Sequence, residues 1–354
     1  MKKTMKGIIA FICFIIALAI MINGLSKIFI PKWKENDSMQ TYMMRGFYDE
    51  KKDSIKVLNV GDSDVYRGVS PNIIWNTAKI PSYTLSSSSQ RMWQSYYLIK
   101  HALNYQSPEV IFLEVNACRY DSGREIAMMH QFFDNMLLDQ VKWEALQDEV
   151  FEFTPSQKLN FLFPILEFHS RYSELTKEDF TLGLGNLHYA EKGFAMKTEI
   201  QPYKGSMTYM KKKKDKNFHI SVKTKKYLDM IVKLCKERNI RLVLFKTPEP
   251  TNWRLEHHEA VNEYAKTHHL DFLDYNIGKQ LSLFDMEKDT MDKGTHLNVY
   301  GAEKLSKSLA EYLQNILKIE PETNQETIQI FDKDYKIFLK DKKRYEALTS
   351  EKES

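Results

Sequence analysis

Short apolar runs alternate with helix-length segments over most of the chain, and this alternation limits the folds that it can adopt. Runs typical of buried strands stand at residues 55–60, 83–85, 110–115, 241–245 and 271–273. Helical patterns separate them, such as 90–105 and a segment in which Leu228, Ile231 and Cys235 share one face. Because strand–helix–strand repetition builds parallel βαβ units, we predict an α/β fold with a three-layer α/β/α arrangement around a five-stranded, mostly parallel sheet.

Changes in composition along the chain predict its domain organisation. Residues 1–33 are expected to form an N-terminal membrane anchor and collar, followed by a polar linker at 34–53. The α/β domain is expected at 54–317, with a helical cap insertion at about 121–217, where Phe, Met and Leu recur at helical spacing. Residues 318–354 are highly charged and weakly periodic, which predicts a C-terminal helical tail.

The N-terminus carries the pattern of a membrane segment. Lys2, Lys3 and Lys6 precede an almost unbroken apolar run at 7–22, and about 20 helical residues suffice to cross the hydrocarbon of a bilayer. A cleaved signal peptide is the alternative, because residues 17–19 resemble a cleavage site, but the apolar run continues beyond them. Both interpretations export the remainder. We predict a single-pass cell-membrane protein with an extracytoplasmic domain.

Charge and cysteine content exclude several classes of partner. The formal net charge is only +4, and no aromatic-plus-basic RNA signature accompanies it, so no nucleic-acid partner is expected. Of the three cysteines, Cys13 lies in the apolar run, and the sequence leaves open whether Cys118 pairs with Cys235. No CxxC motif or Cys/His cluster indicates zinc. We expect no metal and no cofactor.

Gly61-Asp62-Ser63 directly follows the predicted strand at 55–60. The carboxyl edge of a parallel sheet is where open α/β folds carry reactive groups, and Gly61 allows a sharp turn there. Ser63 would then stand near a helix start, where backbone N–H groups can stabilise an oxyanion. Asp62 and Ser63 are also common helix caps, so this tripeptide indicates a nucleophile only if the chain supplies a base.

A loop near the other end of the domain supplies a base and an acid. Asp292 and His296 lie in DTMDKGTHLN (289–298), just before an amphipathic helix. A serine hydroxyl attacks at neutral pH when an imidazole takes its proton and a carboxylate fixes the imidazole tautomer. We therefore predict Ser63 as nucleophile, His296 as base and Asp292 as its acid. Asp289 and Asp285 remain alternatives for the acid.

Asn116 directly follows the predicted strand at 110–115. This position would place its side-chain amide on the same sheet edge as Ser63, where it could donate to an oxyanion. An asparagine that ends a strand is otherwise a turn residue.

Four segments together resemble the SGNH/GDSL hydrolase superfamily: GDSDVYRGVSP, SSSSQ, VIFLEVN and DKGTHLNVYGAEKLS. The resemblance spans residues 55 to about 313. Within the superfamily the chain is most similar to the membrane-anchored extracytoplasmic branch, which includes proteins of D-alanyl-lipoteichoic acid biosynthesis and alginate O-acetylation. This resemblance implies an SGNH-hydrolase-like fold and ester-bond chemistry that serves acyl transfer.

The resemblance also implies roles for individual residues. Ser63 would be the nucleophile, with its own backbone N–H in the oxyanion hole, His296 the base and Asp292 the acid. Asn116 stands where the oxyanion asparagine of the family would. The glycine that donates a second oxyanion N–H in the family has no clear counterpart, but the stretch 86–90 occupies its place, with Ser89 and Gln90 as the candidates.

The sequence departs from the family pattern in three ways. Asp64 replaces the usual leucine after the serine, and the Gly-Xaa-Asn-Asp block is missing. Asp292 precedes His296 by four residues where three is usual. PILEFHSRYSEL, with Arg171, and FKTPEPTNW, with Trp253, also resemble this branch, and either segment could line the cleft or pack in the core.

Together these observations lead us to expect an extracytoplasmic serine esterase or O-acyltransferase that acts on a cell-surface polysaccharide or teichoic-acid-like polymer through a Ser-His-Asp acyl-enzyme mechanism. The sequence does not distinguish hydrolysis from transfer. The resemblance and the anchor favour transfer beside a membrane-bound O-acyltransferase partner. The alternative hypothesis is a catalytically silent module that binds or scaffolds cell-envelope glycan assembly, suggested by the altered Asp–His spacing.

Overall fold

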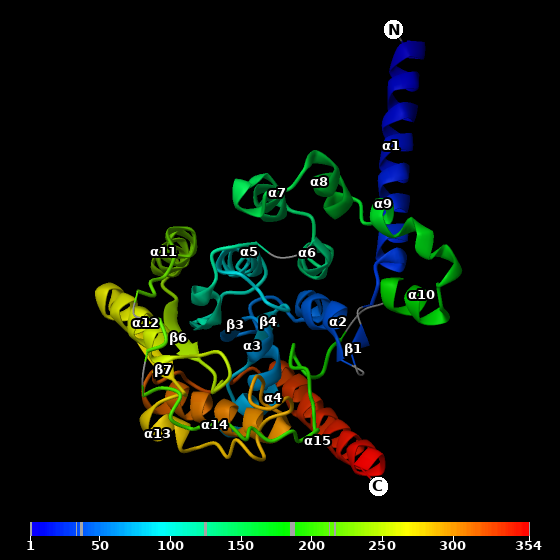
Figure 1. Ribbon diagram of the computed structural model, residues 1–354. Coiled ribbons are helices and arrows are strands. Elements are labelled where there is room, and N and C mark those ends of the chain that lie inside the picture. The colour runs from blue at the N-terminus through cyan, green and yellow to red at the C-terminus, as the bar shows by residue number, and fades with distance from the viewer. Residues whose placement is uncertain are drawn as a thin grey trace.

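The computed structural model describes residues 2–32, 34–35, 38–123, 126–184, 188–211, 213–215 and 217–353. A central sheet lies between two helical layers, and a group of short helices stands on the side from which a long N-terminal helix projects (Figure 1). The predicted three-layer α/β/α class is confirmed, and the five-stranded sheet is parallel throughout.

The sheet has the strand order β4-β3-β5-β6-β7. Its strands are β3 (Val57–Gly61), β4 (Ser82–Ser86), β5 (Val110–Glu114), β6 (Arg241–Lys246) and β7 (Asp271–Asp274). The chain runs from β3 outward to β4 and then returns to the other side of β3 with β5. The carboxyl ends of β3 and β5 therefore form the topological switch point, where open α/β sheets bind their ligands.

Alternate strand residues pack against opposite helical layers, as the two-residue period of a strand requires. On one face, Val57, Phe112 and Val243 lie in a core with α3 (Ser63–Gly68), α4 (Pro71–Ala78) and α14 (Val299–Asn315). On the other face, Leu58, Ile111 and Leu244 lie in a core with α5 (Met92–Ala102), α11 (Val222–Glu237) and α12 (Leu255–His268). The short α13 (Gly278–Leu281) follows β7.

Between β5 and α11 the chain forms the helical insertion. Its helices are α6 (Ile126–Phe133), α7 (Gln140–Gln147), α8 (Pro155–Leu162), α9 (Ile165–Phe168) and α10 (Lys177–Leu184), with short 3₁₀ turns η2 (Asn116–Arg119), η3 (Glu149–Phe151) and η4 (His169–Ser173). The aromatic rings of Phe133, Phe151 and Phe161 pack together in it. The described residues from 188 to 221 contain no helix or strand, so the helices occupy only the first part of the predicted insertion.

This irregular second part of the insertion runs back along the α/β domain, and we call residues 188–203 the strap. The amide of Thr84 donates to Lys192 O (2.9 Å), and the amide of Ala195 donates to Tyr66 O (2.7 Å). Further along, the amide of Gln201 donates to Thr290 O (3.0 Å). The strap therefore reaches from the edge strand β4 to the loop that precedes α14.

The N-terminal helix α1 (Lys2–Phe29) contains a stretch, Met5–Phe29, that is long and apolar enough to cross a membrane. Its side chains are exposed from Met5 to Met21 apart from the half-buried Leu18, whereas Ser26 and Ile28 are buried against the rest of the protein. The membrane anchor predicted at 1–33 therefore corresponds to a single helix whose final turn is packed.

The segment that follows α1 contributes to the core. It forms a two-stranded antiparallel ribbon of β1 (Lys34–Glu35) and β2 (Ser38–Met39), then α2 (Gln40–Arg45) and the 3₁₀ turn η1 (Gly46–Asp49). Met43, Met44 and Phe47 are buried. The 34–53 segment, interpreted from its polarity as a linker, thus supplies side chains to the domain.

The C-terminal helix α15 (Gln325–Glu353) packs beside α4, with Phe331 and Phe338 buried. A fully buried lysine connects it to two distant parts of the chain. Lys192 Nζ of the strap lies 2.6 Å from Glu50 Oε1 and 2.7 Å from Asp334 Oδ2, and all three side chains are nearly or completely inaccessible. A buried ionic cluster of this kind stabilises the fold only while every partner is present, because each charged group has lost its hydration.

We expect Lys192→Met to lower the free energy of unfolding by about 3–5 kcal/mol, since it leaves the buried carboxylate of Glu50 without its cation and that of Asp334 with His188 alone. Lys51→Met is the matched control, because Lys51 also pairs with α15, through Glu326, but both side chains are exposed. It should cost less than about 1 kcal/mol. Thermal and denaturant unfolding of the full chain measure the stability of both variants. Equal losses of stability would contradict a structural role for the buried Lys192 cluster.

Candidate active site

Ser63 lies at the switch point of the sheet. β3 ends at Gly61, Asp62 is the N-cap of α3, and Ser63 is the first residue of that helix. A Cβ at Gly61 would stand 2.5 Å from the Val65 side chain and 2.6 Å from Glu114 Cβ, so only glycine fits this turn. The Asp62 carboxylate accepts from the Asp64 amide at 3.0 Å. Asp62 therefore performs the capping, and the hydroxyl of Ser63 is left for another partner.

That partner is the imidazole of His296. Ser63 Oγ lies 2.9 Å from His296 Nε2, and the opposite ring nitrogen, Nδ1, lies 2.5 Å from Asp292 Oδ2. Because the carboxylate can only accept, Asp292 fixes the proton on Nδ1 and leaves the Nε2 lone pair for the serine hydroxyl. All three side chains are half-buried, so the group is reachable from solvent. The structure thus brings the predicted nucleophile, base and acid into one hydrogen-bonded chain.

The loop conformation explains how an acid four residues before the histidine can reach it. Lys293 (φ 62°) and Gly294 (φ 97°) both adopt left-handed backbone conformations, which fold the extra residue out of the way. Asp292 Oδ1 then accepts from the amides of Thr295 (3.1 Å) and His296 (2.7 Å). The unusual spacing is therefore compatible with an oriented carboxylate.

The two other acids that the sequence left open have different partners. Asp289 is buried, lies 2.5 Å from Lys304 Nζ, and accepts from the amide of Asp285 at 2.7 Å. Asp285 pairs with Lys288 at 3.2 Å. Of the three candidates, Asp292 is the acid that contacts the imidazole.

Asn116 lies at the predicted sheet edge, next to the residue that precedes the serine. Its side-chain amide donates to Asp62 Oδ2 at 2.8 Å, and its carbonyl oxygen accepts from Arg119 at 2.8 Å. Its backbone amide donates to Glu114 Oε2 at 2.8 Å. An asparagine amide carries two N–H groups, so one is engaged with Asp62 and the second is the candidate oxyanion donor.

Ser89 and Gln90 lie in the turn between β4 and α5, and their groups serve that turn. The Gln90 amide group accepts from Ser87 Oγ (3.0 Å) and donates to Ser95 Oγ (2.9 Å), and the Gln90 backbone N–H donates to Ser87 O (3.3 Å). Ser89 has a left-handed backbone conformation (φ 51°). In the part of the chain that the structure describes, no hydrogen bond joins Ser89 or Gln90 to Ser63 or His296, so their role in an oxyanion hole stays a prediction.

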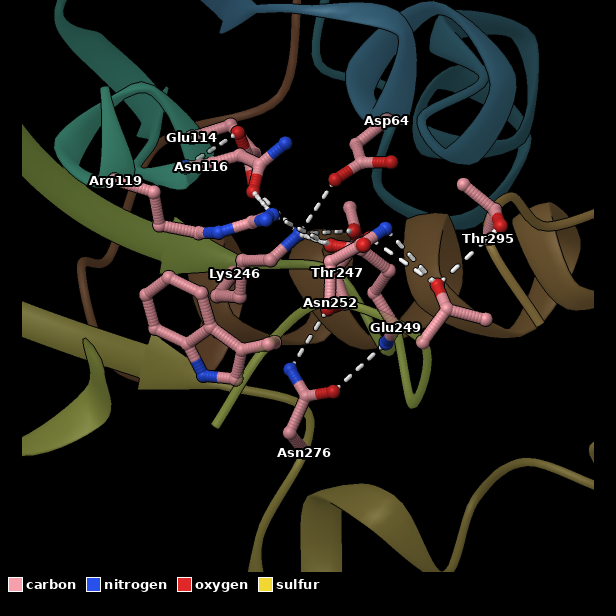
Figure 2. Close-up of polar contacts among 12 residues, drawn as sticks. Asp64, Glu114, Asn116, Arg119, Lys246, Thr247, Glu249, Asn252, Asn276 and Thr295 are labelled. Atoms are coloured by element: carbon pink, nitrogen blue, oxygen red, sulfur yellow. Dashed lines mark hydrogen bonds and ion pairs between the residues drawn. The ribbon is translucent and has the colours of Figure 1, made fainter. Parts of the chain in front are cut away.

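Directly behind the serine lies a buried charge cluster that the sequence did not predict. Figure 2 shows the ammonium group of Lys246, at the end of β6, reaching between Asp64 and Glu114. Its Nζ lies 2.5 Å from Asp64 Oδ2, 3.0 Å from Glu114 Oε1 and 3.0 Å from Glu249 Oε2. Lys246 is fully inaccessible and the three carboxylates almost so.

The charged groups of this cluster shift one another's pKa values. Burial opposes the charged form of Lys246, but the carboxylates of Asp64, Glu114 and Glu249 outweigh it and hold the lysine pKa well above its usual value. Burial raises the pKa of Asp64 and raises that of Glu114 well above its usual value, in spite of the lysine. The carboxylates therefore favour the charged form of Lys246, while burial disfavours the charged forms of Asp64 and Glu114.

This cluster also bears on metal binding. Asp62, Asp64 and Glu114 offer carboxylate oxygens within 4.8 Å of one another, a spacing that could hold a metal ion. Lys246 already contacts two of these carboxylates, so the chain's own ammonium group provides the positive charge there.

Contacts from the Lys246 cluster continue to the histidine loop. Asp64 Oδ1 lies 3.9 Å from His296 Nε2. On the far side, Thr251 Oγ1 donates to Glu249 Oε1 (3.4 Å) and lies 3.3 Å from Thr295 Oγ1, next to the histidine in the sequence. The serine turn, the asparagine turn and the histidine loop therefore meet around one lysine.

Lys246 lies in the segment FKTPEPTNW, but the sequence pattern did not single out this residue. The signal that could have found it is a lysine that directly ends an apolar strand, a position where an unpaired charge is costly. In the same segment Trp253 is fully buried and donates to Asp274 (2.9 Å), so it belongs to the core. Arg171 lies elsewhere, beside α1, where it donates to Phe29 O (2.5 Å). Cys118 and Cys235 are both buried and free.

No family model and no curated protein matches the chain.

The ionisation of His296 is the first measurable consequence of this geometry. Burial lowers the pKa of His296, but the Asp292 hydrogen bond and the Asp64 charge outweigh it, so the pKa lies above the usual 6.5. Asp292→Asn removes both an acceptor and a charge, and should lower the histidine pKa. NMR titration of selectively labelled histidine measures the shift, and Asp285→Asn is the control that should leave the pKa of His296 unchanged.

The interaction of His296 with Asp292 and Asp64 also contributes to stability in a pH-dependent way. This contribution is fully present below pH 6.5 and is lost as the pH rises through the raised pKa of His296.

A second prediction concerns Lys246. Lys246→Met should lower the free energy of unfolding by about 3–5 kcal/mol, because it leaves buried carboxylates without their cation. Lys213→Met, which removes an exposed lysine paired with Glu259, should change it by less than about 1 kcal/mol. Asp64 and Lys246 are in direct contact, so the effects of removing them should not add. The double variant Asp64→Leu/Lys246→Met should lose less free energy of unfolding than the two single variants lose in total. Strict additivity in denaturant unfolding would contradict the pairing.

Proposed function

We propose that this chain is an extracytoplasmic serine esterase or O-acyltransferase that acts on a cell-surface polysaccharide or teichoic-acid-like polymer. The observation that carries the proposal is the continuous chain from Ser63 Oγ through His296 to Asp292 at the carboxyl edge of a parallel sheet. A serine that merely caps a helix has no need of an imidazole at 2.9 Å whose other nitrogen is held by a carboxylate.

In the proposed reaction, Ser63 Oγ attacks the carbonyl carbon of an ester while His296 Nε2 takes the hydroxyl proton. The amide groups near Ser63, with Asn116 as the side-chain candidate, would stabilise the oxyanion that forms. His296 then returns the proton to the departing alcohol oxygen as the ester bond breaks, leaving an acyl group on Ser63. Asp292 stabilises the imidazolium at both stages.

The second half-reaction decides between esterase and transferase. Water or the hydroxyl of a sugar or polyol attacks the acyl-enzyme, His296 takes the proton of the attacking group, and Ser63 is restored. The residues of the site serve both outcomes equally. Transfer is favoured by the N-terminal helix, which is long and apolar enough to hold the domain at a membrane beside a membrane-bound O-acyltransferase that supplies acyl groups.

The direct test is covalent labelling of the full chain in detergent or lipid nanodiscs with a fluorophosphonate, followed by peptide mass spectrometry. We expect one adduct, on Ser63, and none in Ser63→Ala. His296→Ala and Asp292→Asn should slow labelling by roughly 10³–10⁴-fold, since the hydroxyl loses its oriented base. Ser206→Ala, which changes an exposed serine, should label at the native rate.

The outcomes separate the candidate functions. Labelling of Ser63 that depends on His296 supports an activated nucleophile, and hydrolysis of an aryl ester with and without a polyol acceptor then divides hydrolysis from transfer. A folded chain with no adduct on Ser63, or with equal labelling of His296→Ala, would overturn the proposal in favour of a catalytically silent module that binds cell-envelope glycan.

A further inference from the structure

The end of α1 is built into the helical insertion. Ser26 Oγ accepts from the amide of Ile165, the first residue of α9, at 3.3 Å. Arg171 of η4 donates to Phe29 O, and the buried Lys32 donates to Lys27 O (2.8 Å) and Ile30 O (3.0 Å). These two side chains satisfy carbonyl oxygens that the end of a helix leaves unpaired. The helix therefore leaves the protein at a fixed angle.

The packing of α10 against the same turn is equally close. A Cβ at Gly183 would stand 2.8 Å from Lys27 O and 3.0 Å from Ile28 Cα, so α10 touches the backbone of α1 directly. Asp179 on α10 adds an ion pair to Lys32 at 3.8 Å. The insertion is thus held at the exit of α1 by contacts from three of its elements.

The length of α1 sets the height of this junction in a bilayer. Met5–Phe29 is 25 residues, or about 37 Å at ~1.5 Å per residue, whereas the hydrocarbon of a bilayer is about 30 Å thick. If α1 crosses the membrane, its last turn lies in the headgroup region. Ser26 and Phe29, and the helices that hold them, then lie there too.

The insertion also carries most of the exposed large apolar side chains outside α1. Of sixteen such side chains among the described residues, nine lie between residues 126 and 180, a small part of the chain. They include Leu159 and Phe163 at α8, Leu166 on α9, and Leu138 and Trp143 at α7. Figure 1 shows α7, α8 and α9 on the side of the domain toward which α1 projects.

We propose that the exposed apolar side chains of α7, α8 and α9 insert into the headgroup and outer acyl region of the bilayer that α1 crosses. We call this surface the α7–α9 face. The occupant is lipid because the face continues the surface of α1 at the height where hydrocarbon ends. At this depth apolar side chains and a tryptophan are buried in lipid, while the polar side chains next to them stay hydrated among the headgroups. The α7–α9 face would hold the domain at one tilt on the membrane, and this does not depend on the activity of Ser63.

The test uses fluorescent labels on the full chain in phosphatidylcholine–phosphatidylglycerol vesicles that contain a quencher-labelled lipid. Leu159→Cys and Leu166→Cys are each made in a Cys13→Ser background, because the other two cysteines are buried. Leu283→Cys is the matched control: Leu283 is a leucine with 45% exposure, against 50% for Leu159 and 52% for Leu166, but it lies next to α13. The native Cys13, within α1, is the positive control.

We expect lipid quenching at positions 159 and 166 to exceed that at 283 by roughly threefold or more, since interfacial groups lie within about 5–10 Å of the acyl boundary. Equal quenching at all three positions, with Cys13 quenched, would overturn the proposal, and so would an unquenched Cys13, because α1 would then not cross the bilayer. Disulfide cross-linking of Leu166→Cys between chains at low protein-to-lipid ratio would also overturn it and identify a second copy as the occupant. Melting temperatures of all variants should match that of the parent.

Discussion

The ammonium group of Lys246 is the interaction on which the candidate site depends. It holds Asp64, which follows Ser63, together with Glu114, whose second oxygen binds the backbone of Asn116. Glu249 extends the same cluster toward Thr251 and the histidine loop. Three segments that are far apart in the sequence are thereby fixed at one sheet edge. A buried ammonium among carboxylates is favourable only when all partners are present and placed, which makes this geometry strict.

Much of the fold could be predicted from the sequence, because buried parallel strands are continuous apolar runs that stand out from amphipathic helices. The five strands lie where those runs indicated, within a few residues. The hydrophobic pattern does not predict the order of the strands in the sheet, because this order depends on how the βαβ units pack together. The 34–53 segment shows the limit of composition: it is polar overall, yet Met43, Met44 and Phe47 are buried, because a few apolar side chains suffice to dock a short helix.

The candidate site was predictable where residue type and position act together. Ser63 and His296 were found because one follows a strand and the other stands in a loop with an acid, and the structure places them in contact. Asp292 could not be chosen over the other acids from its spacing alone. It reaches His296 because Lys293 and Gly294 adopt left-handed backbone conformations, which the spacing does not reveal. Lys246 was missed because its significance lies in its carboxylate partners, two of which, Asp64 and Glu114, come from other segments. Ser89 and Gln90 rested on the family resemblance alone, and their contacts serve the turn.

The docked end of α1 has a consequence for encounters in a membrane. A domain on a flexible tether searches a volume and loses orientational freedom whenever it meets a partner, whereas a domain fixed to its span has already lost that freedom on folding. With Ser26, Phe29 and Lys32 bound into the insertion, helix and domain would rotate and diffuse as one body. Any membrane-embedded partner would then meet the sheet edge that carries Ser63 in a two-dimensional search, always in the same orientation.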